Sequence, residues 1–162
     1  MKRLIITRHA QAEFKDGVLD FDRDLDDTGV AEAAKMAFNL KKKGVGIDKI
    51  LYSSSQRTTS TMKIINESYQ ISNENLEAQQ KLYLAIPRIL IEWIKETDDS
   101  VKNLMLIAHN PGISDLMKVL TNGSVGGIPT CGMVSIMFDI NSWSEVSNNG
   151  KLGFFIYPKM YK

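Results

Sequence analysis

Each of the two histidines in this 162-residue chain directly follows, or lies one residue beyond, a run rich in apolar residues. The run Leu4–Thr7 is followed by Arg8 and His9. The run Leu104–Ala108 is followed directly by His109. Such runs predict buried strands, and in open α/β sheets ligands bind outside the carboxyl ends of the strands. A single histidine at a strand end is commonly a satisfied core residue, but two of two, one beside an arginine, favour a shared site.

Another cation follows the next predicted strand, Lys49–Tyr52. Ser53 and Gln56 have the spacing of a capping box, which predicts Ser53 as the N-cap of a helix that runs to about Tyr69. Arg57 then lies in the first turns of that helix, where a cation is unfavourable for stability because the end is already electropositive. A bound anion would justify it. Arginines and helix N-termini both donate to phosphate oxygens, and a histidine beside them can attack phosphorus.

The remaining pattern alternates strands with helices, which predicts a layered α/β fold with a mostly parallel sheet in one domain, residues 1–162. Further strands are expected at Lys2–Thr7, near Leu76, and at Asn103–Ala108, Met133–Ile140 and Leu152–Tyr157. Further helices are expected at Thr28–Lys43, Pro87–Glu96 and from Asn110 to about Leu120, with Thr28 and Asn110 as N-caps. The buried face of the first helix should carry Val30, Ala33, Ala34, Ala37 and Leu40.

Composition excludes several classes of protein. The net charge of +1 gives no reason to expect nucleic acid or an anionic membrane as a partner, and the hydrophobic content of 43% is ordinary for a globular protein. A single cysteine, Cys131, cannot form an internal disulfide. With no signal-peptide pattern and no apolar run of about 18 residues, we expect a cytoplasmic protein, and we expect a monomer.

These motifs together resemble those of a known family. The motifs are Arg8-His9-Ala10, Ser53-x-x-x-Arg57-x-x-x-Thr61 and His109-Asn110-Pro111-Gly112. In this order they resemble the histidine phosphatase superfamily, also called phosphoglycerate-mutase-like. The short chain, the stretch from Arg23-Asp24-Leu25 to Gly29, Leu82-Tyr83 and Pro129-Thr130 are similar to its small SixA-type phosphohistidine phosphatase branch. The resemblance covers most of the chain and implies a three-layer αβα sandwich with a mainly parallel central sheet.

By this resemblance His9 is the nucleophile and becomes phosphohistidine, while Arg8, Arg57 and His109 bind the phosphoryl oxygens. No cofactor and no metal are implied, and inorganic phosphate is the product. The chemistry agrees, because phosphoryl transfer needs positioning and charge stabilisation above all. His9 must be neutral to attack, so we expect its other ring nitrogen to hold its N–H against a backbone carbonyl.

Three positions depart from the family pattern without removing chemistry. Ser54 stands where a proline is frequent, Thr58 where an alanine is frequent, and Ala10 where the wider superfamily has a glycine. Many larger members also use a glutamate as general acid. Glu13 and Glu77 are the candidates here, but a solvated surface role is the commoner one for such residues, so no acid is assigned.

The segment between Arg57 and His109 has room for two helices and a short connection but for no extra subdomain, and larger members cover their pocket with insertions there. An open site predicts phosphohistidine on a partner protein as substrate, for example a phosphorelay histidine domain. Its leaving imidazole is easily protonated near neutral pH, unlike an alkoxide.

Three alternatives remain. A small-molecule phosphomonoesterase or mutase would use the same pocket, and a phosphate-recognising binding module would use it without turnover. A metal hydrolase would need carboxylates or cysteines beside the histidines, and Arg8 next to His9 opposes a cation.

Overall fold

The computed structural model describes residues 1–123 and 126–162. The strands are β1 (Lys2–Arg8), β2 (Lys49–Ser53), β3 (Leu76–Gln79), β4 (Asn103–Ala108), β5 (Met133–Phe138) and β6 (Lys151–Ile156). The helices are α1 (Asp27–Lys42), α2 (Gln56–Tyr69), α3 (Pro87–Lys95) and α4 (Gly112–Thr121). Short 3-10 turns include η1 (Asp20–Asp22) and η3 (Gln80–Leu82).

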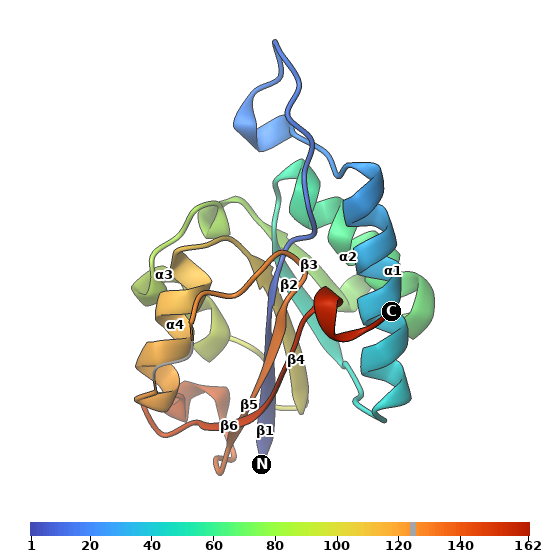
Figure 1. The fold of residues 1–162 in the computed structure, drawn as a ribbon. Coiled ribbons are helices and arrows are strands. Elements are labelled where there is room, and N and C mark those ends of the chain that lie inside the picture. The colour runs from blue at the N-terminus through green and yellow to red at the C-terminus, as the bar shows by residue number, and fades with distance from the viewer. Residues whose placement is uncertain (124–125) are drawn as a thin grey trace.

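The strands form one six-stranded sheet in the order β3-β2-β4-β1-β5-β6. Strands β1 to β4 are mutually parallel, whereas β5 pairs antiparallel with both β1 and β6. Helices α1 and α2 cover one face of the sheet, and α3 and α4 cover the other (Figure 1). The predicted three-layer αβα sandwich with a mainly parallel sheet is therefore confirmed.

Successive side chains of β1 pack into the hydrophobic cores on opposite faces of the sheet. Leu4 and Ile6 pack into the core under α3 and α4, and Ile5 packs into the core under α1 and α2. All three side chains are fully buried. A strand covered on both faces reads as a continuous apolar run because successive side chains point to opposite sides.

Helix α1 begins earlier than expected. Asp26, and not Thr28, is its N-cap, and the Asp26 carboxylate accepts a hydrogen bond of 2.7 Å from the backbone N–H of Gly29. Aspartate is the better cap because its charge also suits the positive end of the helix. The buried face of α1 carries Gly29, Ala33, Met36, Ala37 and Leu40, whereas Val30 is 47% exposed, contrary to its predicted place on that face. Ala34 is also exposed, contrary to its predicted place on the buried face.

Two other predicted N-caps are wrong as well. Ser53 pairs with Gln79 as the last residue of β2, so the chain stays extended to that point and Ser55 is the N-cap of α2. At α4 the N-cap is Pro111. The Asn110 side chain instead donates to the carbonyl of Ile128 and accepts a hydrogen bond from the hydroxyl of Ser114.

Within the described ranges, none of the helices is long and apolar enough to cross a membrane.

Candidate active site

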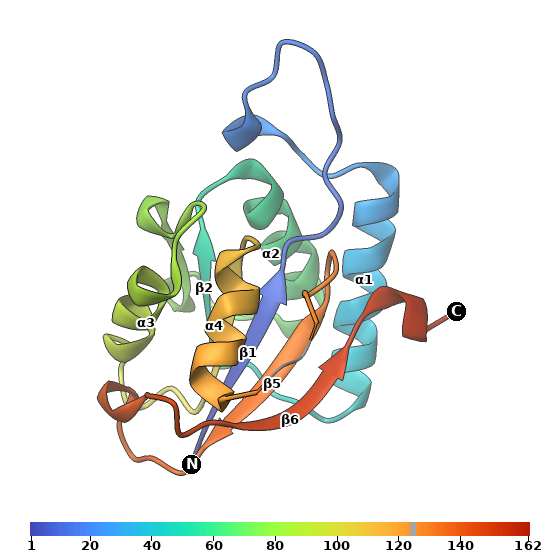
Figure 2. The same ribbon diagram turned by 60° about the vertical axis from the view of Figure 1, so that its left-hand side comes forward.

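The carboxyl ends of β1, β2 and β4 meet at one edge of the sheet, and a pocket of about 320 Å³ opens there. The segment between β1 and α1 projects beyond this edge (Figure 2). The structure brings the predicted site residues Arg8, His9, Arg57 and His109 together in the lining of this pocket. The rest of the lining is Gln11, Ala12, Phe14, Arg23, Leu84, Asn110 and Thr130.

His9 is held in one orientation by its backbone neighbours. Its Nδ1 lies 2.7 Å from the carbonyl oxygen of Ala10, and since a carbonyl can only accept, Nδ1 carries the N–H and Nε2 keeps the lone pair. The N–H of Ala10 donates in turn to the Thr61 hydroxyl at 3.0 Å, and that hydroxyl donates to the carbonyl of Arg57. Thr61, which is fully buried, thus ties the loop that begins at His9 to α2.

Arg57 is 4% exposed and lies in the first turn of α2. Its Nε donates to Nε2 of His9 at 3.3 Å. Its other donors reach η1, where Nη1 donates to the carbonyl of Asp20 at 2.7 Å and Nη2 donates to the Asp20 carboxylate at 3.1 Å. The guanidinium therefore links the candidate nucleophile to the loop after β1.

Arg8 and His109 complete the set of candidate phosphate ligands. Arg8 donates from Nη1 to the carbonyl of Ile128 at 3.2 Å, and its buried Nε has no partner among the described residues. Nε2 of His109 lies 2.8 Å from the hydroxyl of Ser53. Nδ1 of His109 is buried and finds no partner in the described part of the chain.

The rings of His9 and His109 lie close together, with centroids 5.4 Å apart and planes tilted by 53°. Burial above all, together with the positive charges of Arg57 and Arg8, lowers the pKa of His9 to about 4, against a raising effect of the Ala10 hydrogen bond. Burial, followed by the neighbouring His9 and Arg57, lowers the pKa of His109 to about 3. Both imidazoles are therefore neutral at pH 7, and the main cause is burial and not the arginines.

A network of side chains from the loop after β1 lies against this site and was missed by sequence reasoning. Asp20 accepts hydrogen bonds from Arg57, from Nη1 of Arg23 at 2.9 Å and from the hydroxyl of Tyr83. These bonds, that of Tyr83 first, lower the pKa of the Asp20 carboxyl to about 2. The guanidinium of Arg23 also stacks over the exposed ring of Phe14 at 4.0 Å.

Ser53 was also missed, because its spacing to Gln56 resembled a capping box. Two signals could have indicated it: its place in the motif shared with Arg57 and Thr61, and its position at the end of a strand that pairs with the strand before His109.

Two glycines allow backbone segments to approach the site closely. A Cβ on Gly112 would lie 2.0 Å from the carbonyl oxygen of Ala85, and one on Gly29 would lie 2.1 Å from that of Gln11. The starts of α4 and α1 therefore sit directly against the loops that carry Leu84 and Gln11 into the pocket lining.

Neither candidate general acid lies in the lining of the pocket. Glu77 pairs with Lys49 at 2.6 Å on β3 and β2. Glu13 sits in the loop after β1, where its backbone carbonyl accepts a hydrogen bond from Arg23. Among the described residues there is also no group of three or more His, Cys, Asp or Glu side chains arranged to hold a metal ion.

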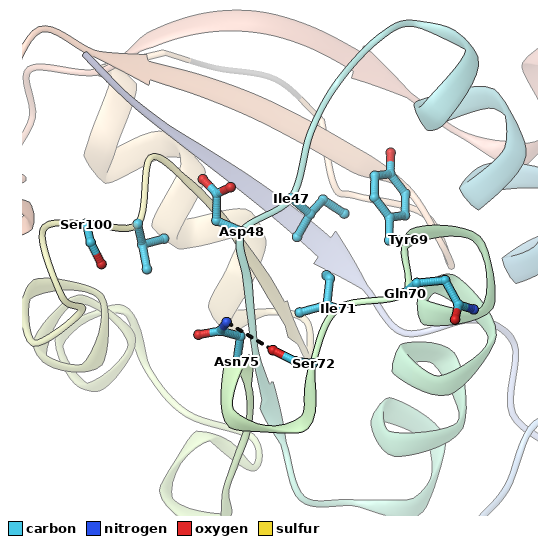
Figure 3. Close-up of a pocket in the computed structure, with 9 residues that line it drawn as sticks. Ile47, Asp48, Tyr69, Gln70, Ile71, Ser72, Asn75 and Ser100 are labelled. Carbon is cyan, nitrogen blue, oxygen red and sulfur yellow. Dashed lines mark hydrogen bonds between the residues drawn. The ribbon is translucent and has the colours of Figure 1, made fainter.

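A second hollow, of about 400 Å³, lies at the opposite edge of the sheet, beside the starts of β2 and β4 (Figure 3). Asp48, Tyr69 and Asn75 are among the side chains around it. Of the described residues that line this hollow, none carries a positive charge, so it does not suit a phosphate group.

Comparison with known proteins agrees with the geometry. The family model of the histidine phosphatase superfamily (branch 1) matches residues 4–81. The uncharacterized protein Rv1276c of Mycobacterium tuberculosis is 30% identical over 115 residues, which are 71% of this chain and 70% of that protein.

Two solved structures are similar in fold. The protein histidine phosphatase SixA complexed with tungstate has a TM-score of 0.85 at 22% identity, with 99% of each chain covered. The mycobacterial glucosyl-3-phosphoglycerate phosphatase Rv2419c has a TM-score of 0.69 at 15% identity, covering 98% of this chain and 99% of that one. On the family match and the relative's identity, this chain belongs to the histidine phosphatase superfamily, and its fold is the SixA-type fold.

Proposed function

We propose that this protein is a phosphatase that forms a phosphohistidine on His9 and removes phosphate from phosphohistidine on a partner protein, for example a phosphorelay histidine domain. Membership of the histidine phosphatase superfamily supports the phosphatase chemistry. The identity of the substrate is inferred from the pocket itself.

In the proposed reaction, the lone pair on Nε2 of His9 attacks phosphorus, and the bond from phosphorus to the leaving group breaks. Arg8, Arg57 and His109 neutralise the charge on the equatorial oxygens, which is where electrostatic stabilisation is largest. Water then attacks the phosphohistidine, Nε2 recovers its lone pair, and inorganic phosphate leaves. In the free protein this lone pair accepts the hydrogen bond from Nε of Arg57 at 3.3 Å, and the donor must turn to a phosphoryl oxygen before Nε2 attacks. Its place beside the attacking nitrogen supports the assignment, because a short movement brings the cation to the phosphoryl group.

One observation carries the substrate class: of the described residues that line the pocket, none is an Asp or a Glu. The nearest carboxyl in the network, that of Asp20, has a pKa lowered to about 2 and is thus an anion with no proton to give. An alkoxide leaving group needs such a proton, whereas an imidazole accepts one from water near pH 7. The pocket therefore favours cleavage of a P–N bond.

The mouth of the pocket supports a protein as the carrier of that bond. Phe14 is 90% exposed and Leu84 is 55% exposed, and both line the opening. Apolar side chains exposed beside a cationic pocket suit a partner surface that presents a phosphorylated side chain. The arginines that line the pocket disfavour a metal ion, so we propose catalysis without one. We further propose that the protein acts as a monomer in the cytoplasm and that residues 1–162 form one domain.

A small phosphomonoester is the second candidate. The fold shared with the glucosyl-3-phosphoglycerate phosphatase favours it, as does a pocket volume of about 320 Å³, which is enough for a small metabolite.

Comparing kcat/KM on a phosphohistidine protein with kcat/KM on p-nitrophenyl phosphate and glucosyl-3-phosphoglycerate decides between the two. We expect the phosphohistidine protein to be preferred by at least about a hundredfold. A preference for either small ester would reject the substrate and keep the pocket chemistry. Phosphate binding without any turnover would make the protein a binding module. Chelator added to each assay should leave the rates unchanged.

A further inference from the structure

Asp20 occupies a donor of Arg57 that a phosphoryl group on His9 would need. Nε and Nη2 lie on the same edge of a guanidinium, the edge that binds phosphate with two parallel hydrogen bonds. In this structure the two nitrogens of that edge donate to different partners. Nε faces Nε2 of His9 at 3.3 Å, and Nη2 faces the Asp20 carboxylate at 3.1 Å.

We propose that the Asp20 carboxylate competes with the phosphoryl group for Arg57 and so lowers the affinity of the pocket for phosphate. This inference rests on the proposed function only in requiring that the pocket bind an oxyanion.

Loss of the hydrogen bond from Nη2 of Arg57 costs Asp20 little free energy. The Asp20 side chain is 48% exposed, and an ion pair with an exposed partner contributes little because water and salt screen it. When Nη2 turns to a phosphoryl oxygen, the carboxylate keeps its hydrogen bonds from Arg23 and from the Tyr83 hydroxyl. It is therefore never left unpaired.

The exchange is favourable on the Arg57 side. The Arg57 side chain is 5% exposed, so its charge needs an anionic partner at all times. A phosphoryl group carries up to two negative charges and sits among Arg8, Arg57 and His109, whereas Asp20 carries one. Nη2 of Arg57 therefore donates to the phosphoryl group while that group is bound, and donates to Asp20 again when phosphate leaves. A hydrolase gains from this arrangement because product release becomes faster.

Phosphate binding by two variants tests the proposal. Asp20→Asn removes the competing charge and keeps the shape of the side chain. Asp22→Asn is the matched control, because Asp22 belongs to the same 3-10 turn and is exposed. Titration calorimetry with inorganic phosphate should give a Kd on the order of fivefold lower for Asp20→Asn than for the wild type, and a Kd within about twofold for Asp22→Asn.

A Kd for Asp20→Asn that is equal to that of the control, or higher than that of the wild type, overturns the proposal; the higher value would make Asp20 a residue that positions Arg57.

A structure of the wild type with bound phosphate gives an answer independent of how the variants fold. We expect the distance from Nη2 of Arg57 to the Asp20 carboxylate to exceed 4 Å there, as the criterion for a broken ion pair. An unbroken pair beside bound phosphate overturns the proposal. Absence of phosphate binding in every form would overturn both this proposal and the proposed function, whereas a preference for small esters would affect only the latter.

Discussion

Arg57 donates its Nε–H to Nε2 of His9 across 3.3 Å, at the ring nitrogen whose lone pair is left free by the Nδ1–H bond to Ala10. The candidate nucleophile and the cation that would receive the phosphoryl oxygens are thus in direct contact before any substrate binds. The anionic partner of this arginine at the electropositive start of α2 is the Asp20 carboxylate, at 3.1 Å from Nη2.

Arg57→Lys should lower kcat by about a hundredfold or more. Lysine keeps the charge but loses the planar fork that donates to two oxygens, and losing such a donor typically costs about 3 kcal/mol in the transition state. Steady-state kinetics on a phosphohistidine protein measure the effect. Arg88→Lys is the matched control, because Arg88 pairs with Glu92 on the exposed surface of α3 and should be silent. Equal rates in the two variants would remove Arg57 from the site.

Thr61→Val should lower kcat by about tenfold and the free energy of unfolding by about 1–2 kcal/mol. The change keeps the shape of the side chain but leaves the buried N–H of Ala10 without its acceptor at 3.0 Å. Because the carbonyl of Ala10 orients His9, the loss should appear in kcat and not only in stability. Thr61→Ser, which keeps the hydroxyl, should recover most of the rate. Failure of serine to do so would mean that the methyl group and not the hydrogen bond matters.

Much of this fold could be predicted because apolar runs and strand ends are local signals. The runs before Arg8 and before His109 correctly predicted β1 and β4, and the residues after them do lie in one pocket. The N-caps of α1, α2 and α4 were mispredicted, since several adjacent residues compete for each cap and tertiary pairing decides. Strand pairing of Ser53 with Gln79 is one example.

The network around Asp20 could not be predicted for a different reason. Asp20 reaches Arg57 across 37 residues and Tyr83 across 63, and nothing in a polar loop indicates which of its several carboxylates will do so. Asp16, Asp20 and Asp22 of that loop are all exposed, so exposure does not distinguish Asp20 from its neighbours either.

Ser53→Ala should lower kcat by about tenfold and destabilise the protein by about 1–3 kcal/mol. The variant removes the hydroxyl 2.8 Å from Nε2 of His109 and leaves that buried nitrogen unpaired and the ring unrestrained. Ser55→Ala is the comparison, because Ser55 is equally buried and bonded to Thr58 but does not touch His109. It should reduce stability and leave kcat unchanged. Thermal unfolding and initial rates separate the two effects, and equal kcat values would show that Ser53 has only a structural role.

The value of kcat/KM should stay constant from neutral pH down to about pH 5 and fall below about pH 4. In the proposed reaction His9 attacks as a neutral imidazole, and its pKa is lowered to about 4, mainly by burial. The free energy of unfolding should also decrease as the pH falls. The unfolded histidine has a pKa near 6.5, so the unfolded state binds more protons between about pH 6.5 and 4, and stability present above pH 6.5 is lost as the pH falls through this window. A pH–kcat/KM profile with its acid limb above 6 would assign the limb to another group.

In the proposed reaction the phosphoryl group passes through His9, and direct trapping of the phosphorylated histidine tests this step. The wild type is mixed with a ³²P-labelled phosphohistidine protein, stopped by alkali within milliseconds, digested, and sequenced by mass spectrometry. We expect acid-labile, alkali-stable phosphate on the peptide that contains His9, formed and lost at rates compatible with turnover, and no label in His9→Asn. Label on His109, or full turnover without any labelled histidine, would contradict the account.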